Sequence, residues 1–205
     1  MSGNSAKLST IPAHVNLKGS TMEYSPEQFA NYFQEWIDNY SDDIKVITEL
    51  LSLEQAPQDL KLMAVGVLNY GLKQLDLIPD FYKPVGLIDD AIILHLFAHI
   101  GIDYIIELKD NRLKKHLINM AEGNEIVKAF VGKEIYRSLM NYVKTLPEEK
   151  VRQRTAKMVV QDEELLKEFI KDIEVELRGY QGAKIEDKKT VLKDLRSFLK
   201  LKLVG

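Results

Sequence analysis

The chain has 205 residues, a formal net charge of −3 and no cysteine. This length is typical of one compact domain with a core of its own. The lack of cysteine excludes a disulfide framework, a thiolate zinc site and a cysteine nucleophile. The acidic balance argues against a general nucleic-acid-binding protein, and no run reaches the roughly 18 uninterrupted apolar residues that a membrane span requires.

Residues 1–24 are rich in small polar residues and show no helical periodicity. They also lack the apolar run of a secretory signal, so we predict an irregular N-terminal arm. The remainder, residues 25–205, is predicted to fold as a single all-α domain. A chain without cysteine fits a reducing compartment, and we therefore expect a cytoplasmic protein.

The first predicted helix begins with a strong local signal. Ser25 is placed as the N-cap, Pro26 takes the first helical position, and Gln28 completes a capping box. Apolar residues then recur at helical spacing up to Tyr40. A second helix is predicted over the apolar residues 44–51, ending before the next proline.

A third helix is predicted from about Gln58 to Gln74, and its apolar centre predicts central burial. Two prolines then interrupt the pattern, and a fourth helix runs to about His99. Gly86 as its N-cap would place Asp89 and the acid that follows it in the first helical turn. Further helices are predicted over residues 102–120, 124–144, 147–160, 162–178 and 187–203.

These elements predict a multi-helix bundle built around a central apolar hairpin, residues 66–99. Residues 102–205 supply the C-terminal helices that cover it. A capping box is predicted at Thr145, and a turn is predicted between Gly179 and Gly182. We find no alternation typical of β-strands and no internal repeat.

The loop of the hairpin carries an unusual run, LDLIPDFYKPVGLIDDAIIL. Over about residues 64–100 this part of the chain resembles the helical hairpin of the domain of unknown function 1232 family, also called YkvA-like. The matching residues are Asp76, Leu77, Ile78, Pro79, Asp80, Gly86, Asp89 and Asp90. The chain departs from the family at Lys73 and Gln74, where Ser-Pro is common, and at Pro84, whose counterpart lies one place earlier. The resemblance implies the hairpin and its acidic loop, and it implies no reaction.

Four aspartates make this loop the candidate functional loop: Asp76, Asp80, Asp89 and Asp90. Acids beside an apolar core must be paired, hydrogen-bonded or metal-bound. Carboxylate oxygens suit Mg²⁺, Mn²⁺ or Ca²⁺, so a metal-dependent hydrolase using these four acids is one hypothesis. We favour the alternative in which the acids cap the loop and the helix start. On that interpretation no metal and no other cofactor is expected.

A second candidate is a polar stripe on the fourth helix. His95 and His99 stand four residues apart and so share one helical face, and Asp103 extends the stripe if the helix continues past Gly101. A metalloprotease motif requires glutamate directly after the first histidine, and leucine stands there. We therefore interpret the pair as a polar stripe, with proton-linked behaviour left open because histidine titrates near neutrality.

The last predicted helix is amphipathic and basic. Its apolar residues are Val191, Leu192, Leu195, Phe198 and Leu199, and lysines from Lys188 to Lys202 crowd the remaining surface. Such a helix can lie on an anionic membrane surface or dock into a partner protein. We favour a third interpretation, in which the apolar stripe packs on the domain and the lysines remain in water.

Signatures of common enzyme classes are absent from the sequence, including the nucleophile elbow, the P-loop and the dinucleotide fingerprint. We therefore predict a non-enzymatic interaction or regulatory module, with a protein partner or self-association. The metal-dependent hydrolase stays open as an alternative, and so does peripheral membrane association. Nucleic acid is the partner that the charge disfavours most.

Overall fold

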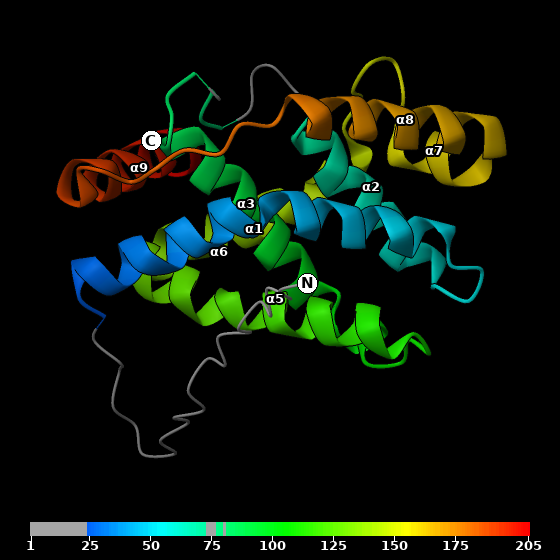
Figure 1. The fold of residues 1–205 in the computed structure, drawn as a ribbon, viewed down its shortest axis with the longest axis horizontal. Coiled ribbons are helices and arrows are strands. Elements are labelled where there is room, and N and C mark those ends of the chain that lie inside the picture. The colour runs from blue at the N-terminus through cyan, green and yellow to red at the C-terminus, as the bar shows by residue number, and fades with distance from the viewer. Residues whose placement is uncertain (1–23, 73–76, 80) are drawn as a thin grey trace, which may run out of the picture.

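The computed structural model describes residues 24–72, 77–79 and 81–205. Over these residues the chain is a multi-helix bundle without β-strands, which confirms the predicted all-α class (Figure 1). The predicted N-terminal arm lies outside the described residues, except for Tyr24. Among the described residues, no helix has the length and apolar character to cross a membrane.

Helix α1, Pro26–Ser52, begins as predicted and ends later than predicted. Ser25 accepts a hydrogen bond from the Gln28 backbone N–H, and the reciprocal bond completes the capping box. The prediction of two helices in this region is wrong. The polar run after Tyr40 interrupts the apolar period, but it contains neither proline nor glycine, so the helix continues and buries Ile44 on the same face.

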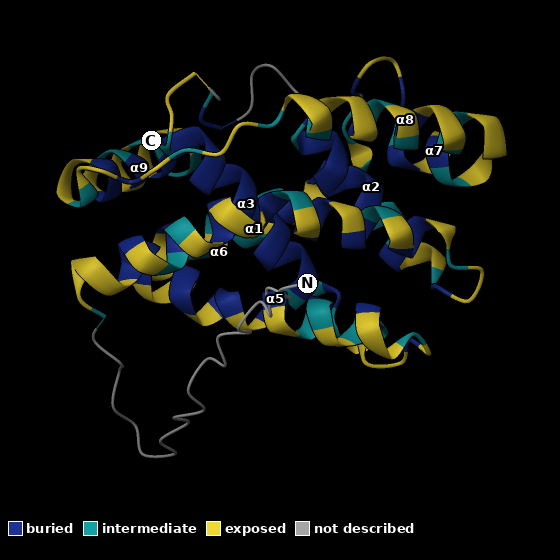
Figure 2. Cartoon of the chain, in the orientation of Figure 1, coloured by how far each residue is buried: buried dark blue, intermediate teal, exposed yellow. Residues whose placement is uncertain are grey.

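Helices α2, Gln58–Tyr70, and α3, Val85–Ile100, lie in the region for which the hairpin was predicted. The more central of the two is α3, in which every residue from Val85 to Ala98 is buried (Figure 2). It packs against α1, α2 and four helices that follow it in the chain. A helix that is apolar on all sides is stable only in such an interior position.

After α3 the predicted boundaries are wrong. Gly101 ends α3 and is followed by the short helix α4, Ile102–Ile105. Asp110 then caps α5, Asn111–Val131, by accepting hydrogen bonds from two backbone N–H groups of its first turn. We predicted one helix from 102 to 120, because the apolar period continues through the short break.

The next predicted break is displaced from residues 121–123 to Gly132. Gly123 lies inside α5, where a Cβ atom would collide with the ring of His95. Gly132 has a φ of 79° and separates α5 from α6, Lys133–Thr145. A positive φ favours glycine, so this position ends the helix.

The predicted helix over 147–160 is replaced by shorter elements. These are the 3₁₀ turn η1, Leu146–Glu148, a tight turn closed by Val151 and Arg154, and α7, Ala156–Gln161. The predicted capping box at Thr145 does not form, because its hydroxyl donates to the carbonyl of Tyr142.

The last two helices agree with the prediction. They are α8, Glu163–Gly179, capped by Asp162, and α9, Lys188–Leu203, capped by Asp187. Val191, Leu192, Leu195 and Leu199 of α9 are buried, and the helix contacts α1, α3 and α6. The apolar stripe of α9 is therefore part of the core, as we favoured.

An extended segment, residues 180–187, joins α8 to α9 along α1 (Figure 1). We call it the strap. The Tyr180 hydroxyl donates to the Ile37 carbonyl at 2.8 Å, and the Gln34 side chain bonds the strap backbone at Ala183 and Ile185. The predicted turn between Gly179 and Gly182 is thus an extended connection, because α1 offers hydrogen-bond partners along its length.

Candidate functional site

Asp89 is buried on α3 and ties three parts of the chain together. Its Oδ2 atom accepts a hydrogen bond of 2.5 Å from the hydroxyl of Tyr70, the last residue of α2. The same hydroxyl accepts a hydrogen bond of 3.0 Å from the backbone N–H of Leu77. Hydrogen bonds to charged groups contribute roughly 1.5–3 kcal/mol. Asp89 therefore holds the end of α2, part of the connection and α3 in one arrangement.

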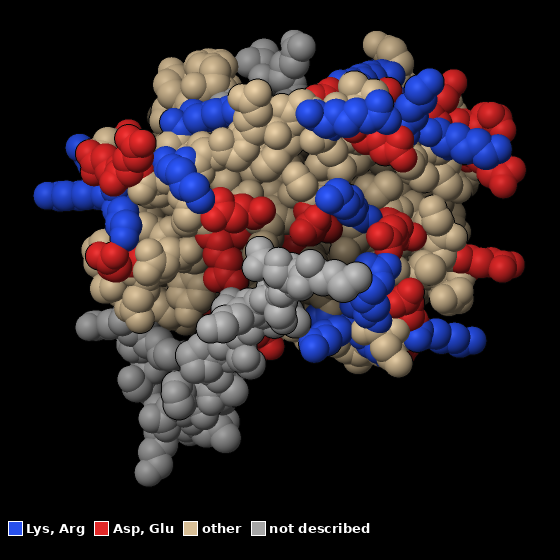
Figure 3. All heavy atoms as spheres, viewed as in Figure 1, with Lys and Arg blue, Asp and Glu red and all other residues tan. Residues whose placement is uncertain are grey.

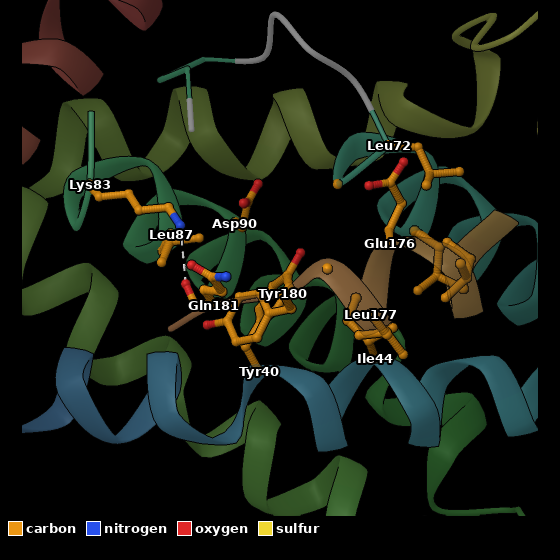
Figure 4. A pocket seen from close by; sticks show the side chains of 14 residues that line it. Tyr40, Ile44, Leu72, Lys83, Leu87, Asp90, Glu176, Leu177, Tyr180 and Gln181 are labelled. Carbon is orange, nitrogen blue, oxygen red and sulfur yellow. Dashed lines mark hydrogen bonds between the residues drawn. The ribbon is translucent and has the colours of Figure 1, made fainter. Parts of the chain in front are cut away.

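Asp90 follows directly but faces different surroundings, because successive residues of a helix project about 100° apart. It lines a cavity of about 220 Å³, shown in Figure 4. The walls come from α1, α3, α8, the end of α2 and the start of the strap. The residues used below are Tyr40, Lys83, Asp90, Glu176, Tyr180 and Gln181.

The cavity has an aromatic wall and a polar rim. The rings of Tyr40 and Tyr180 stack with their centroids 5.1 Å apart. Burial raises the pKa of Tyr180, and the negative charges of Asp90 and Asp38 raise it further. At the rim, the Lys83 ammonium donates to the Gln181 carbonyl at 3.1 Å. The described lining of the cavity thus combines aliphatic, aromatic and acidic side chains, with Lys83 at its edge.

The acidic loop is therefore only partly assembled as predicted. Asp76 and Asp80 lie outside the described residues, so the four-acid set stays a prediction. The capping role predicted for Asp89 and Asp90 in the first turn is wrong. Because α3 begins at Val85, they occupy its fifth and sixth positions, and the first turn contains no acid. Within the described ranges, no three histidine or acidic side chains gather in a way that could hold a metal ion.

The predicted polar stripe is divided by the end of α3. His95 is buried and stacks on Trp36, with ring centroids 3.9 Å apart. Its Nδ1 atom lies 2.8 Å from the Met120 carbonyl and carries the proton, because a carbonyl only accepts. Burial lowers the pKa of His95, so its ring is neutral at physiological pH. His99 is half-buried, and Asp103 is exposed on α4.

Sequence reasoning missed an exposed cluster that we call the aromatic patch. It consists of the exposed Phe81 and Tyr82, the half-buried Phe198 and, about one turn further along α9, the exposed Leu201. Phe81 is 74 % exposed and Leu201 is 68 % exposed. The rings of Phe81 and Tyr82 lie 4.6 Å apart, and those of Tyr82 and Phe198 lie 5.3 Å apart. The available signal was an aromatic pair between two prolines, where a turn exposes side chains.

The two segments that form the aromatic patch are basic. Residues 81–88 and 195–205 contain no acid, and they carry Lys83, Arg196, Lys200 and Lys202. Elsewhere the signs mix: the face seen in Figure 3 carries acidic and basic side chains interspersed over the helices. The patch therefore combines exposed aromatic rings with basic side chains that are close in sequence, and Asp80, Asp89 and Asp194 border the two ranges.

Comparison with known families identifies one segment of the chain. Residues 60–96 match the family described as "Protein of unknown function (DUF1232)". This confirms the resemblance over most of α2, its connection and α3, a minor part of the chain. The matched segment contains the Tyr70–Asp89 hydrogen bond and two residues of the aromatic patch. No curated protein and no solved structure matches the chain.

Proposed function

We propose that this chain is a non-enzymatic interaction module in which the DUF1232 segment and α9 together form the docking surface for a partner protein. The observation that carries the proposal is the aromatic patch. The tilted rings of residues 81, 82 and 198 contact one another across two segments that are distant in sequence, and those of residues 81 and 82 are exposed to solvent.

Exposed aromatic residues are the side chains that most often anchor protein interfaces. Most large apolar side chains of this chain are buried, including the four on the inner face of α9. Phe81 and Leu201 are exceptions, because they remain largely exposed. Clustered exposure of this kind typically marks an interaction surface.

The charges near the aromatic patch indicate what kind of partner would bind there. Lys83 follows Phe81 and Tyr82 in the sequence, Lys200 and Lys202 flank Leu201, and residues 81–88 and 195–205 contain no acid. We therefore infer that the partner presents an amphipathic helix with acidic residues beside its apolar face. A second copy of this chain is a poorer occupant, because two basic patches facing each other would repel.

The burial of α9 favours a protein over a membrane. An interfacial helix must insert its apolar face among lipid tails, and the apolar face of α9 is occupied by α1, α3 and α6. The use of Asp89 as a structural acceptor favours a non-enzymatic role, because that carboxylate already bonds Tyr70. The hydrolase alternative depends on Asp76 and Asp80, which the structure does not describe.

The test uses a labelled model peptide with leucines at helical spacing on one face and glutamates on the other. We expect it to bind the full chain in a fluorescence-anisotropy titration, more tightly than a lysine version of the same peptide. Phe81→Ser and Leu201→Ser should each weaken binding by about tenfold, or roughly 1.4 kcal/mol.

Ile106→Ser provides the matched control, because Ile106 is also exposed and lies outside the aromatic patch. It should bind the peptide as the wild type does. Equal binding of the acidic and basic peptides, or unchanged binding by both patch variants, would contradict the proposal. Sedimentation with anionic vesicles that depends on Phe81 and Leu201, without peptide binding, would replace the protein partner by a membrane surface.

A further inference from the structure

A neutral histidine is enclosed where α1, α3 and α5 meet. His95 of α3 stacks on Trp36 of α1, and it lies against Met120 and Gly123 of α5. We call these four residues the histidine contact. We propose that the histidine contact is an acid-sensitive switch, which opens locally when the His95 ring binds a second proton. This inference is independent of the docking surface proposed above, so either can fail without the other.

The ring of His95 has no room to turn toward water. It is 5 % exposed, and its centroid lies 3.9 Å from that of the Trp36 ring. The α5 backbone also approaches it so closely that a Cβ atom at Gly123 would collide with both rings. Its Nδ1–H group donates to the Met120 carbonyl at 2.8 Å. The ring is therefore held in one orientation by α1 and α5 together.

The second ring nitrogen decides how the histidine contact responds to acid. The Nε2 atom of His95 is buried and has no hydrogen-bond partner among the described residues. In the neutral ring this atom is an acceptor, and in the charged ring it becomes an N–H donor. A buried charged donor without an acceptor costs far more than an unpaired neutral nitrogen. Protonation therefore favours an arrangement in which Nε2 reaches water, and this requires α1 or α5 to move away from the ring.

Two titratable groups near the histidine contact act on His95 in opposite directions. Burial lowers the pKa of His95 most, whereas the charge of Asp43 on α1 and the Met120 carbonyl raise it. The charge of His116 on α5 lowers it again. Helices α2, α4, α6 and α9 also pack on α3, but among the described residues the groups that shift this pKa belong to α1 and α5. The net result is a ring that stays neutral in the closed arrangement.

His116 lies in the interface of α5 with α1 and should respond differently. Its Nε2 atom lies 2.6 Å from Oδ1 of Asp43, a buried carboxylate. A charged His116 therefore keeps an acceptor for its proton, whereas a charged His95 has none. Acid should open the contact at His95 and leave the pair of His116 and Asp43 in place.

The pH range of the switch follows from the open state. There the His95 ring is hydrated and should titrate near the ordinary histidine pKa of about 6.5. Below that pH the open state binds more protons than the closed state. The opening equilibrium constant therefore rises as pH falls, by up to about tenfold per pH unit. Above about pH 6.5 neither state binds this proton, and the contact stays closed.

Hydrogen exchange measured by mass spectrometry on the full chain tests the switch, because amide exchange reports local opening. We compare about pH 7.5 with about pH 5.5 and correct for the intrinsic pH dependence of exchange. In α5 peptides that contain Met120 and Gly123, the opening constant should be about tenfold larger at the lower pH. Peptides of α8, which packs on α7, are the internal reference and should not change. No rise in α5, or an equal rise in α8, would overturn the proposal.

Variants assign the response to one histidine. His95→Gln and His95→Phe cannot bind the second proton, so their α5 peptides should change by less than about twofold. His99→Gln is the matched control, because His99 lies one turn further along α3 and is half-buried. It should keep the full rise. A tenfold rise that persists in both His95 variants would overturn the proposal.

The remaining histidines decide the question if neither His95 variant folds. His14→Gln, His99→Gln and His116→Gln together cover every other histidine of the chain. Each should keep the rise in α5, with its onset near about pH 6.5. Loss of the rise in any one of them would assign the response to that residue and overturn the proposal.

Discussion

Asp89 and Asp90 are neighbours on α3 and both are buried, yet they belong to different surroundings. Asp89 accepts a short hydrogen bond from Tyr70 and fixes the connection between two helices. Asp90 faces a cavity whose opposite wall is Tyr180, far along the chain. Two adjacent acids in a motif are therefore not one functional unit. The rotation of the helix separates them into a structural acceptor and a group that lines a cavity.

The largest expected effect comes from removing Asp89, which accepts the hydrogen bond of Tyr70. Asp89→Ala removes a charge-assisted hydrogen bond and leaves the Tyr70 hydroxyl without its acceptor. We expect a loss of about 3 kcal/mol in the free energy of unfolding, measured by urea denaturation. Glu122→Ala, an exposed acid on α5, is the control and should stay within about 0.5 kcal/mol of the wild type.

Removal of the donor of the same hydrogen bond should have a smaller effect on stability. Tyr70→Phe keeps the ring packing but leaves the Asp89 carboxylate and the Leu77 N–H without the hydroxyl. We expect a loss of about 2 kcal/mol. In a double-mutant cycle with Asp89→Asn, the two changes should be coupled by about 1 kcal/mol or more. Additive effects would show that the two side chains do not act through their hydrogen bond.

The different position of Asp90 should appear in the titration of Tyr180 rather than in the stability of the fold. Asp90→Asn should lower the pKa of Tyr180, because one of the negative charges that raise it is removed. Asp89→Asn should leave that titration unchanged. Spectra of selectively labelled tyrosine at rising pH would measure both. Equal shifts in the two variants would remove the distinction between the acids.

The raised pKa of Tyr180 also has a consequence for the wild type. Its folded form holds the phenol proton at pH values where the unfolded chain, with a pKa near about 10, has released it. The folded state then binds more protons, so stability is unaffected below that pH and falls as pH rises above it. Denaturation midpoints measured from neutral to strongly alkaline pH should show this decline, and it should be weaker in Tyr180→Phe.

The smallest expected effect concerns metal. A cation shared by Asp89 and Asp90 would make them one site after all. We expect the melting temperature to be the same with a chelator and with added Mg²⁺ or Zn²⁺. A clear rise with one metal that is lost in Asp89→Asn would restore the four-acid hypothesis for the loop.

Three helix starts with a side-chain cap were predictable, because the signal lies within a few residues, whereas the starts capped by Asp110 and Thr155 were missed. Ser25, Asp162 and Asp187 each cap the helix that was expected after them. Helix breaks were harder. The sequence does not distinguish Gly123, which makes room for the His95 ring, from Gly132, which ends α5 by its positive φ. Both depend on contacts or dihedral angles that arise only after folding.

The candidate site was predictable in its members and not in their roles. Asp89 and Asp90 were recognised as acids in an apolar segment, and the segment matches the expected family. Their partners come from other elements: Tyr70 ends α2, and Tyr180 follows α8. Spacing along one helix indicates which residues share a face, but it does not indicate what that face meets.

The strap has a consequence for how the chain is made. Residues 180–187 bond α1 through Gln34 and Ile37, more than 140 residues earlier in the sequence. During synthesis, α1 emerges well before the strap that covers part of it. Contacts between such distant segments form slowly, because a long loop must close before they contribute. A newly made chain therefore keeps one side of α1 uncovered until the strap has been translated, and this interval is when chaperones have access to it.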